Sequence, residues 1–144
     1  MGFNYTAVDQ DEATTQRRCR EGETFVAVLD GRIVGTLTLL DEASTSGSPW
    51  LDRDGVASLG QFAVEPSLQG RGIGGALMDR AEARAAERGV TYLAGDTADG
   101  AAHLIAYYAA RGFRVVEKVR WPGKTYESVV LVKALPAAAG IERA

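Results

Sequence analysis

The sequence contains a single cysteine, a single histidine and no long hydrophobic run, and each shortage excludes a class of protein. Cys19 has no second cysteine with which to form an internal disulfide, and one histidine offers no ligand set for a zinc site. No stretch approaches the 18 apolar residues of a membrane-spanning helix, and the acidic opening MGFNYTAVDQDE differs from a signal peptide. We therefore expect a cytoplasmic protein without a metal and without a membrane partner.

An excess of positive charge is also missing. The 16 Lys and Arg residues against 19 Asp and Glu residues leave a net charge of −3. Proteins that bind nucleic acids need a basic surface to displace counterions from phosphates, so we expect no nucleic-acid partner. A length of 144 residues with 46% hydrophobic residues suits one globular domain. We place this domain at residues 1–135 and expect a flexible tail over 136–144, which has too little to bury.

Local patterns predict a mixed sheet with helices. Asp30-Gly31 separates two β-rich runs and is the two-residue signal for a tight hairpin. Ile73, Leu77, Ala81 and Ala85 recur every four residues and predict one apolar helix face. The expected elements are a short strand at 3–8, a helix at 9–20, strands at 24–29, 32–39 and 56–64, a helix at 74–88, a strand at 90–94, a helix at 101–111, and strands at 113–119 and 126–134.

The predicted connections complete this expected fold. Gly22 is expected to end the first helix, and residues 95–100 are expected to form a loop. The loop at 41–55 either shapes a substrate pocket or is a mobile surface excursion. The element order predicts the α/β (α+β) class, with a mostly antiparallel sheet, one central βαβ step and helices on both faces.

The most informative segment is the glycine-rich turn Gln69-Gly70-Arg71-Gly72-Ile73-Gly74-Gly75, between a predicted strand and a predicted helix. Glycines let the backbone come close to a ligand, and the first turn of a helix presents free N–H groups and a positive dipole end. Arg71 adds a charge and Gln69 adds a donor. The turn is therefore predicted to bind a pyrophosphate.

A dinucleotide-binding fingerprint is the main alternative for this turn. Residues 70–75 satisfy the pattern G-x-G-x-x-G, and Asp96 lies at a suitable distance for a ribose hydroxyl. Five residues nevertheless separate Val64 from Gly70, and an antiparallel hairpin precedes the motif. Both features argue against the dinucleotide fold, which also needs further βαβ units. A Walker A loop is excluded because no Gly-Lys-Ser/Thr follows.

Two segments together resemble a known family. Residues 62–78 resemble the acetyl-CoA motif of the GCN5-related N-acetyltransferases, with Gln69, Gly72 and Gly74 at its defining positions, and residues 107–113 resemble the family's helix that ends in a tyrosine before Gly-Phe. The resemblance covers about residues 25–135 and implies acetyl-CoA as co-substrate, with its pantetheine in a gap beside the strand ending at Val64. The implied cofactor-binding residues are Phe62, Ala63, Val64, Gln69, Gly70, Arg71, Gly72, Ile73, Gly74 and Gly75.

The resemblance also implies the reaction, which is direct attack of a primary amine on the thioester. Tyr108 resembles the family's general acid, and an ordinary phenol stays protonated at neutral pH. Family members often carry a Glu or His base near the positions that Ser58 and Gly60 occupy here. Either water relays the proton to a carboxylate, or the substrate arrives partly deprotonated. The candidate carboxylates are Asp52, Asp54, Glu65 and Asp96.

Other features leave the acceptor side open. Only 23 residues precede Thr24, whereas the family usually places a strand and two helices there, so we expect a shortened N-terminal region. The pocket is then either open to a bulky acceptor such as a peptide N-terminus or completed by a second subunit of a homodimer. His103 is predicted to be a surface residue, and Cys19 lacks the base that a covalent mechanism requires. A CoA-binding protein without catalytic activity is the alternative, because the usual strand base is missing.

Overall fold

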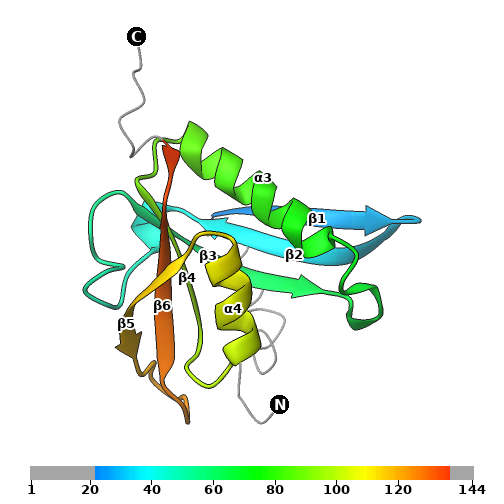
Figure 1. Cartoon of the computed structure of the whole chain (residues 1–144). Helices are drawn as coiled ribbons and strands as arrows, with labels where there is room; N and C mark the ends of the chain where they lie inside the picture. The colour runs from blue at the N-terminus through cyan, green and yellow to red at the C-terminus, as the bar shows by residue number, and fades with distance from the viewer. Residues whose placement is uncertain (1–21, 137–144) are drawn as a thin grey trace.

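The computed structural model describes residues 22–136. The strand expected at 3–8, the helix expected at 9–20 and, apart from Pro136, the tail expected at 136–144 lie outside these residues. The elements follow one another as β1 (Gly22–Leu29), β2 (Arg32–Leu40), the 3-10 helix η1 (Glu42–Ser44), β3 (Val56–Val64), the 3-10 helix η2 (Pro66–Leu68), α3 (Ile73–Glu87), β4 (Tyr92–Ala98), α4 (Ala102–Ala110), β5 (Arg114–Val119) and β6 (Ser128–Ala134) (Figure 1).

The strands form one six-stranded sheet in the order β1-β2-β3-β4-β6-β5. Every neighbouring pair is antiparallel except β3 and β4, which α3 connects as a βαβ unit. The predicted mixed α+β fold with its central βαβ step is therefore confirmed. The β1–β2 hairpin is also confirmed, because Asp30 and Gly31 have φ angles of 52° and 76°, as the favoured two-residue turn requires.

The single parallel pair is short. It runs only from Val56 opposite Tyr92 to Ser58 opposite Ala94. Beyond that point β3 keeps pairing with β2 as far as Val64, while β4 keeps pairing with β6 as far as Ala98. The two strands consequently diverge in the middle of the sheet, which Figure 1 shows as the different directions of β3 and β4.

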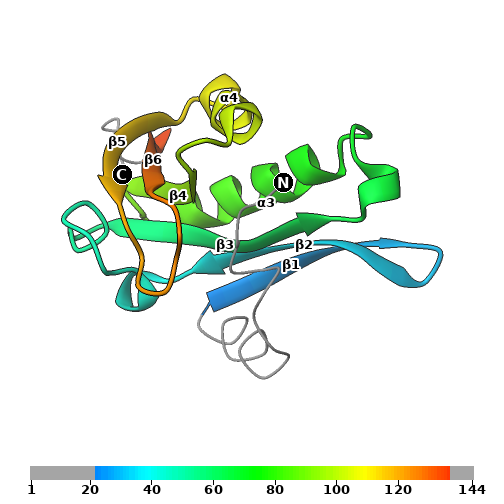
Figure 2. The ribbon, with the colours of Figure 1, turned by 90° about the horizontal axis from the view of Figure 1, so that it is seen from below.

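The main hydrophobic core lies between the sheet and the two described helices. α3 and α4 cover the same face of the sheet, as the view in Figure 2 shows. Leu77, Ala81 and Ala85 of α3 are buried there, which confirms the predicted apolar face, and Met78 joins them. The prediction of helices on both faces included the N-terminal helix, which lies outside the described residues.

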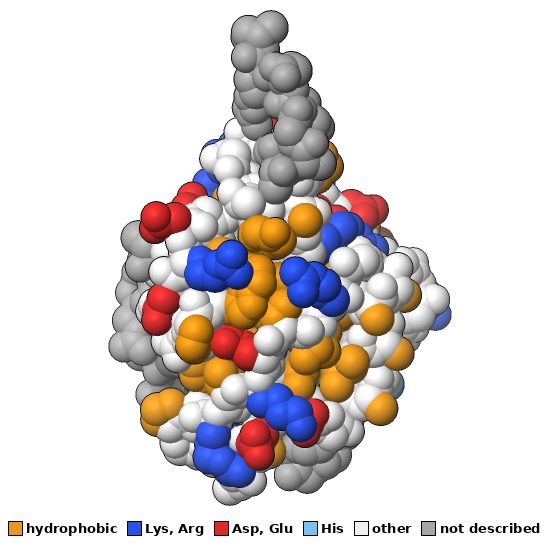
Figure 3. Space-filling view, turned by 60° about the vertical axis from the view of Figure 1, so that its left-hand side comes forward, with side chains coloured by type: hydrophobic (Ala, Val, Ile, Leu, Met, Phe, Trp, Pro, Cys, Tyr) orange, Lys and Arg blue, Asp and Glu red, His pale blue; other side chains and the backbone are white. Residues whose placement is uncertain are grey.

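A second, smaller core lies on the opposite face. Neighbouring residues of a strand point to opposite faces, and Val130 belongs to this second cluster whereas Val129 and Leu131 belong to the first. The loop 41–55 covers the second cluster with Leu51 and Trp50. Hydrophobic side chains gather on this side of the molecule, bordered by charged ones (Figure 3). The loop thus packs against the sheet, and its proposed part in a substrate pocket stays a prediction.

Gly22 begins β1, where it pairs with Leu40, and the helix that it was expected to end lies outside the described residues. One expectation about an individual element is wrong. Residues 95–98 do not form a loop but belong to β4, because they pair one by one with β6 as far as Ala98 opposite Ser128. A side chain on Gly95 would crowd Tyr108, since a Cβ atom there would lie 3.2 Å from the tyrosine ring.

Candidate active site

The glycine-rich turn has the backbone geometry that the sequence predicts. Gly70 and Gly72 have φ angles of 81° and 84°, in the left-handed region that favours glycine. Gly72 is the N-cap of α3, and the first hydrogen bond of the helix runs from the Ala76 N–H to the Gly72 carbonyl. The N–H groups of residues 73–75 precede that bond and are available to a ligand. A Cβ atom on Gly70 or Gly72 would meet nothing within 4 Å, so the turn faces open space.

The two polar side chains of the turn are both exposed, and one of them has a defined partner. Nε2 of Gln69 donates a hydrogen bond of 3.2 Å to the carbonyl of Val64, the last residue of β3. This bond ties the turn back to the strand. Arg71 contributes a positive charge at the solvent edge of the same turn. An anion at the N-terminus of α3 would therefore meet the helix dipole and one nearby cation.

Aromatic side chains pack closely against the first turn of α3, at the position of a glycine. A Cβ atom on Gly74 would lie 3.2 Å from Cζ of Phe62 and 3.7 Å from Oη of Tyr107. The rings of Phe62 and Tyr107 lie 6.2 Å apart between their centroids. The Phe62 side chain is therefore part of the packing beneath α3, which leaves its backbone as the part that can face a ligand.

A β-bulge distorts β3 just beyond the point where it leaves β4. Thr36 lies opposite Ala63 and Thr38 opposite Gly60, so Gln61 and Phe62 together face one residue of β2. Gln61 has a φ of 52°, unusual for a residue other than glycine, and its carbonyl accepts a hydrogen bond of 2.8 Å from Thr36 Oγ1. Sequence reasoning missed this bulge, although Gly60 directly before it is a glycine inside a strand, which often marks a bulge.

Tyr108 lies where β3 and β4 separate. Its side chain is only 7% exposed, and its ring packs edge-to-face on Phe113 at a centroid distance of 5.1 Å. A Cβ atom on Gly95, the residue after the last β3–β4 pair, would lie 3.4 Å from the phenol oxygen. Burial and the nearby negative charge of Asp96 raise the pKa of the Tyr108 phenol well above its ordinary value. The phenol therefore stays protonated near neutral pH and can act as a proton donor, not as a phenolate base.

Asp96, the residue after Gly95 in β4, is the carboxylate whose charge acts on this phenol. Its Oδ2 accepts a hydrogen bond of 2.9 Å from Nε1 of Trp121. The side chain is reached by solvent, yet the surrounding protein atoms displace part of its hydration, and this raises the pKa of the Asp96 carboxyl. The Trp121 hydrogen bond and the positive charge of Lys124 act in the opposite direction. Trp121 also packs on the loop 41–55, because a Cβ atom on Gly47 would lie 3.0 Å from its ring.

The other candidate bases lie in different surroundings. Oδ1 of Asp52 accepts a hydrogen bond of 3.0 Å from the backbone N–H of Gly47 within the loop. Asp54 is exposed on the same loop, and Glu65 follows β3 at its far end. Among these four carboxylates, only the charge of Asp96 raises the pKa of Tyr108. His103 is exposed on α4, as expected.

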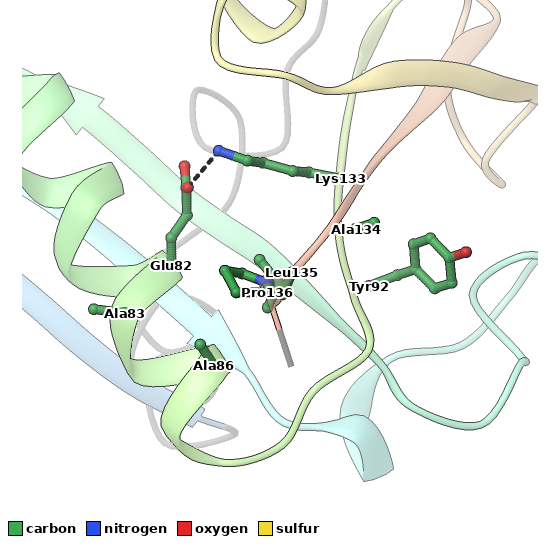
Figure 4. A pocket seen from close by; sticks show the side chains of 8 residues that line it. All are labelled: Glu82, Ala83, Ala86, Tyr92, Lys133, Ala134, Leu135 and Pro136. Atoms are coloured by element: carbon green, nitrogen blue, oxygen red, sulfur yellow. Dashed lines mark hydrogen bonds and ion pairs between the residues drawn. The ribbon is translucent and has the colours of Figure 1, made fainter. Parts of the chain in front are cut away.

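A separate hollow of about 580 Å³ lies toward the other end of α3 (Figure 4). Ala83 and Ala86 of α3 and Ala134 of β6 supply much of its wall, and Glu82 and Lys133 form an ion pair of 2.6 Å at its edge. It contains none of the residues of the glycine turn and neither Tyr108 nor Asp96. The candidate site therefore lies elsewhere, in the gap between β3 and β4.

Within residues 22–136, no three His, Cys, Asp or Glu residues lie close enough together to hold a metal ion. In the same part of the chain, no helix has the length and apolar character needed to cross a membrane.

Comparison with known proteins identifies the family. The family model described as the acetyltransferase (GNAT) family matches residues 2–113, which is more than half of the chain. The chain therefore belongs to the GNAT family of acetyltransferases. A search of curated protein sequences found no significant match.

Solved structures show the same fold. An IAA acetyltransferase from Bacillus cereus is 24% identical, with 88% of this chain and 87% of that chain covered and a TM-score of 0.69. A GNAT family acetyltransferase from Elizabethkingia anophelis with acetyl-CoA bound is 20% identical, with 88% and 85% covered and a TM-score of 0.68. The ribosomal-protein-S18-alanine N-acetyltransferase from Escherichia coli is 19% identical, with 88% and 77% covered and a TM-score of 0.70.

Proposed function

We propose that this protein transfers an acetyl group from acetyl-CoA to a primary amine of a small molecule or peptide, by direct attack in a ternary complex. The observation that carries the proposal is the position of the Tyr108 phenol, beside Gly95 at the point where β3 and β4 diverge. Asp96 follows Gly95 on the same strand and points to the opposite face of the sheet, where Trp121 holds it, so a proton donor and a proton acceptor would flank the gap from its two faces. This pairing suits aminolysis of a thioester.

The residues around the gap fit acetyl-CoA. The backbone N–H groups of residues 70–75 and the Arg71 side chain would hold its pyrophosphate, because they combine free donors, a helix dipole and a cation. The backbone of Phe62, Ala63 and Val64 would bind the amides of the pantetheine arm along β3. Gln69 keeps the turn tied to Val64. When bound, acetyl-CoA supplies the acetyl group in the activated form of a thioester.

Asp96 and Tyr108 would then handle the protons. Asp96 would accept the proton of the attacking amine, and its raised pKa makes it a stronger base than an ordinary aspartate. Tyr108 would donate its phenol proton to the departing thiolate. Trp121 would keep the Asp96 carboxylate in place through the indole N–H. Asp96 thus replaces the strand base that is absent at Ser58 and Gly60.

The rival function is CoA binding without catalysis, because Ser58 and Gly60 cannot serve as bases at neutral pH. Two measurements separate the possibilities. Calorimetry compares acetyl-CoA, CoA and NAD as ligands, and a thiol-release assay then compares polyamines, aminoglycosides, amino acids and peptides as acceptors. We expect micromolar CoA binding and amine-dependent thiol release. Binding of NAD with none of CoA would refute the cofactor, and CoA binding without amine-dependent release would favour the rival.

The cofactor position has its own test in Gly72→Asp. The substitution brings a carboxylate to the N-terminus of α3, where it would repel a pyrophosphate, and it also forces an L side chain into a left-handed conformation. We expect a folded variant that binds CoA at least a hundredfold more weakly in calorimetry. Full affinity in a folded variant would contradict the site.

A further inference from the structure

Two arginines lie beside one tryptophan on the face of the sheet that carries the second core. The guanidinium of Arg53 is 3.8 Å from the centroid of the Trp50 ring, and that of Arg114 is 5.8 Å from it. Both arginines are exposed, and neither forms an ion pair within residues 22–136. An aromatic face attracts a guanidinium and leaves the N–H donors at its edge available to another acceptor.

An acidic side chain on the same face is committed to the backbone. Glu117 and Arg114 lie in β5 opposite Val130 and Val132 of the second core, so both side chains share its face. Oε1 of Glu117 accepts a hydrogen bond of 3.3 Å from the backbone N–H of Trp50. One carboxylate offsets only part of two positive charges. This face therefore presents an excess of positive charge at Trp50, in a chain whose net charge is −3.

Asp96 lies on the same face as these arginines. It pairs with Val130 from the other side of β6, whereas Arg114 pairs with Val132, so two strand spacings and two residues separate them. With strands about 4.8 Å apart and about 3.3 Å per residue, their Cα atoms lie about 12 Å from each other. An extended peptide covers that distance in about four residues.

We propose that Arg53 and Arg114 form a docking surface for an acidic peptide whose N-terminal amine is the acetyl acceptor at Asp96. The inference rests on the proposed function and narrows its acceptor to peptides with acidic side chains near the third and fourth residues. Planar guanidiniums match carboxylates, which can accept two parallel hydrogen bonds from one arginine. Hydrophobic side chains gather on this side of the molecule and are bordered by charged ones, as an exposed peptide-binding face requires (Figure 3).

The same distance argues against other acceptors. A small amine held at Asp96 does not span about 12 Å and gains nothing from the arginines. A polyamine is long enough, but its further positive charges would be repelled by two guanidiniums. An acidic peptide is the acceptor that combines the required length with the complementary charge.

The test compares two amidated peptides that differ only in charge, Ala-Gly-Glu-Glu-Gly-Ala-Gly and Ala-Gly-Gln-Gln-Gly-Ala-Gly. Because exposed ion pairs contribute modestly, we expect kcat/KM of the wild-type protein to favour the acidic peptide by about threefold to thirtyfold. High salt should reduce this preference. Arg53→Gln and Arg114→Gln should each remove part of it, and the double variant should treat both peptides alike.

Arg80→Gln is the matched control. Arg80 is exposed on α3, and its guanidinium lies 6.0 Å from the ring of Phe25, which packs on the main core across the sheet. This variant removes the same charge from another aromatic ring and should keep the wild-type peptide preference. The Kd for CoA should stay unchanged in all variants, because none of these arginines belongs to the glycine turn.

Equal kcat/KM for the two wild-type reactions would overturn the inference, as would a preference that survives in the double variant. Acetylation of polyamines without acetylation of either peptide would overturn it as well. If the wild-type protein does not bind CoA, the proposed function fails instead. Calorimetry then still tests the docking surface, which is supported if the acidic peptide binds and the double variant loses that binding.

Discussion

Gly95→Ala is the sharpest test of how the strand β4 positions Tyr108. The new methyl group would lie 3.2 Å from Cε1, 3.3 Å from Cζ and 3.4 Å from Oη of the tyrosine. Gly95 does not have a positive φ, so alanine adopts its backbone conformation without strain, and the effect comes from crowding alone. Because Tyr108 is enclosed between Gly95 and Phe113, its ring must move by a few tenths of an ångström.

The magnitude follows from two opposing terms. Overpacking of a core costs about 1–3 kcal/mol, and replacement of glycine by alanine returns about 0.4–1 kcal/mol through the unfolded chain. The net loss of about 1 kcal/mol corresponds to a fall of about 2–4 °C in the melting temperature. A displacement of 1 Å costs about a hundredfold in rate, so a shift of a few tenths should lower kcat about threefold to tenfold.

Thermal unfolding and steady-state kinetics measure the two effects. Gly60→Ala is the control for stability, since Gly60 lies in the neighbouring strand β3 and a Cβ atom there would be 3.6 Å from Leu40, an ordinary contact. We expect this control to melt at the wild-type temperature or slightly above it. A Gly95→Ala variant with wild-type melting temperature and wild-type kcat would refute the placement of the phenol against β4.

Three further predictions concern the protons and are checked by kinetics and calorimetry. Tyr108→Phe should keep CoA affinity and lower turnover by about 10²- to 10⁴-fold, the usual contribution of a general acid; unchanged turnover would remove Tyr108 from the mechanism. Asp96→Asn should cause a loss of similar size at unchanged CoA affinity, and full activity would return the role of base to water or to the substrate. Trp121→Phe removes a hydrogen bond that lowers the pKa of Asp96, so that pKa rises and the acidic limb of the kcat/KM profile moves to higher pH. Trp50→Phe, which changes the other tryptophan, should leave this limb in place, and an unmoved limb in Trp121→Phe would show that Asp96 is not the titrating base.

Local signals in the sequence predicted most of the fold. Asp30-Gly31 specified its hairpin because few residue pairs adopt two positive φ angles. The spacing of Leu77, Ala81 and Ala85 specified the buried face of α3. Both features are set by residues close together in the chain, so a short stretch of sequence was enough to predict them.

The parts that sequence reasoning missed depend on distant contacts. Residues 95–98 look like a loop because glycine, aspartate and alanine are poor strand markers, and only their pairing with β6 makes them a strand. The hydrogen bond between Asp96 and Trp121 joins residues 25 positions apart, so no local pattern in the sequence indicates it. The different directions of Tyr107 and Tyr108 become visible only once α4 is placed against α3 and β4.

The divergence of β3 and β4 makes the sheet two half-sheets that share three residue pairs. Beyond Ser58 and Ala94, each half has an interior edge whose backbone groups have no strand partner across the gap within residues 22–136. A ligand bound there as proposed would contact both interior edges and connect the half-sheet that ends in β3 with the half-sheet that begins with β4. Binding and folding are then linked, and a ligand at a hundred times its Kd adds about 2.7 kcal/mol to the stability of the whole domain.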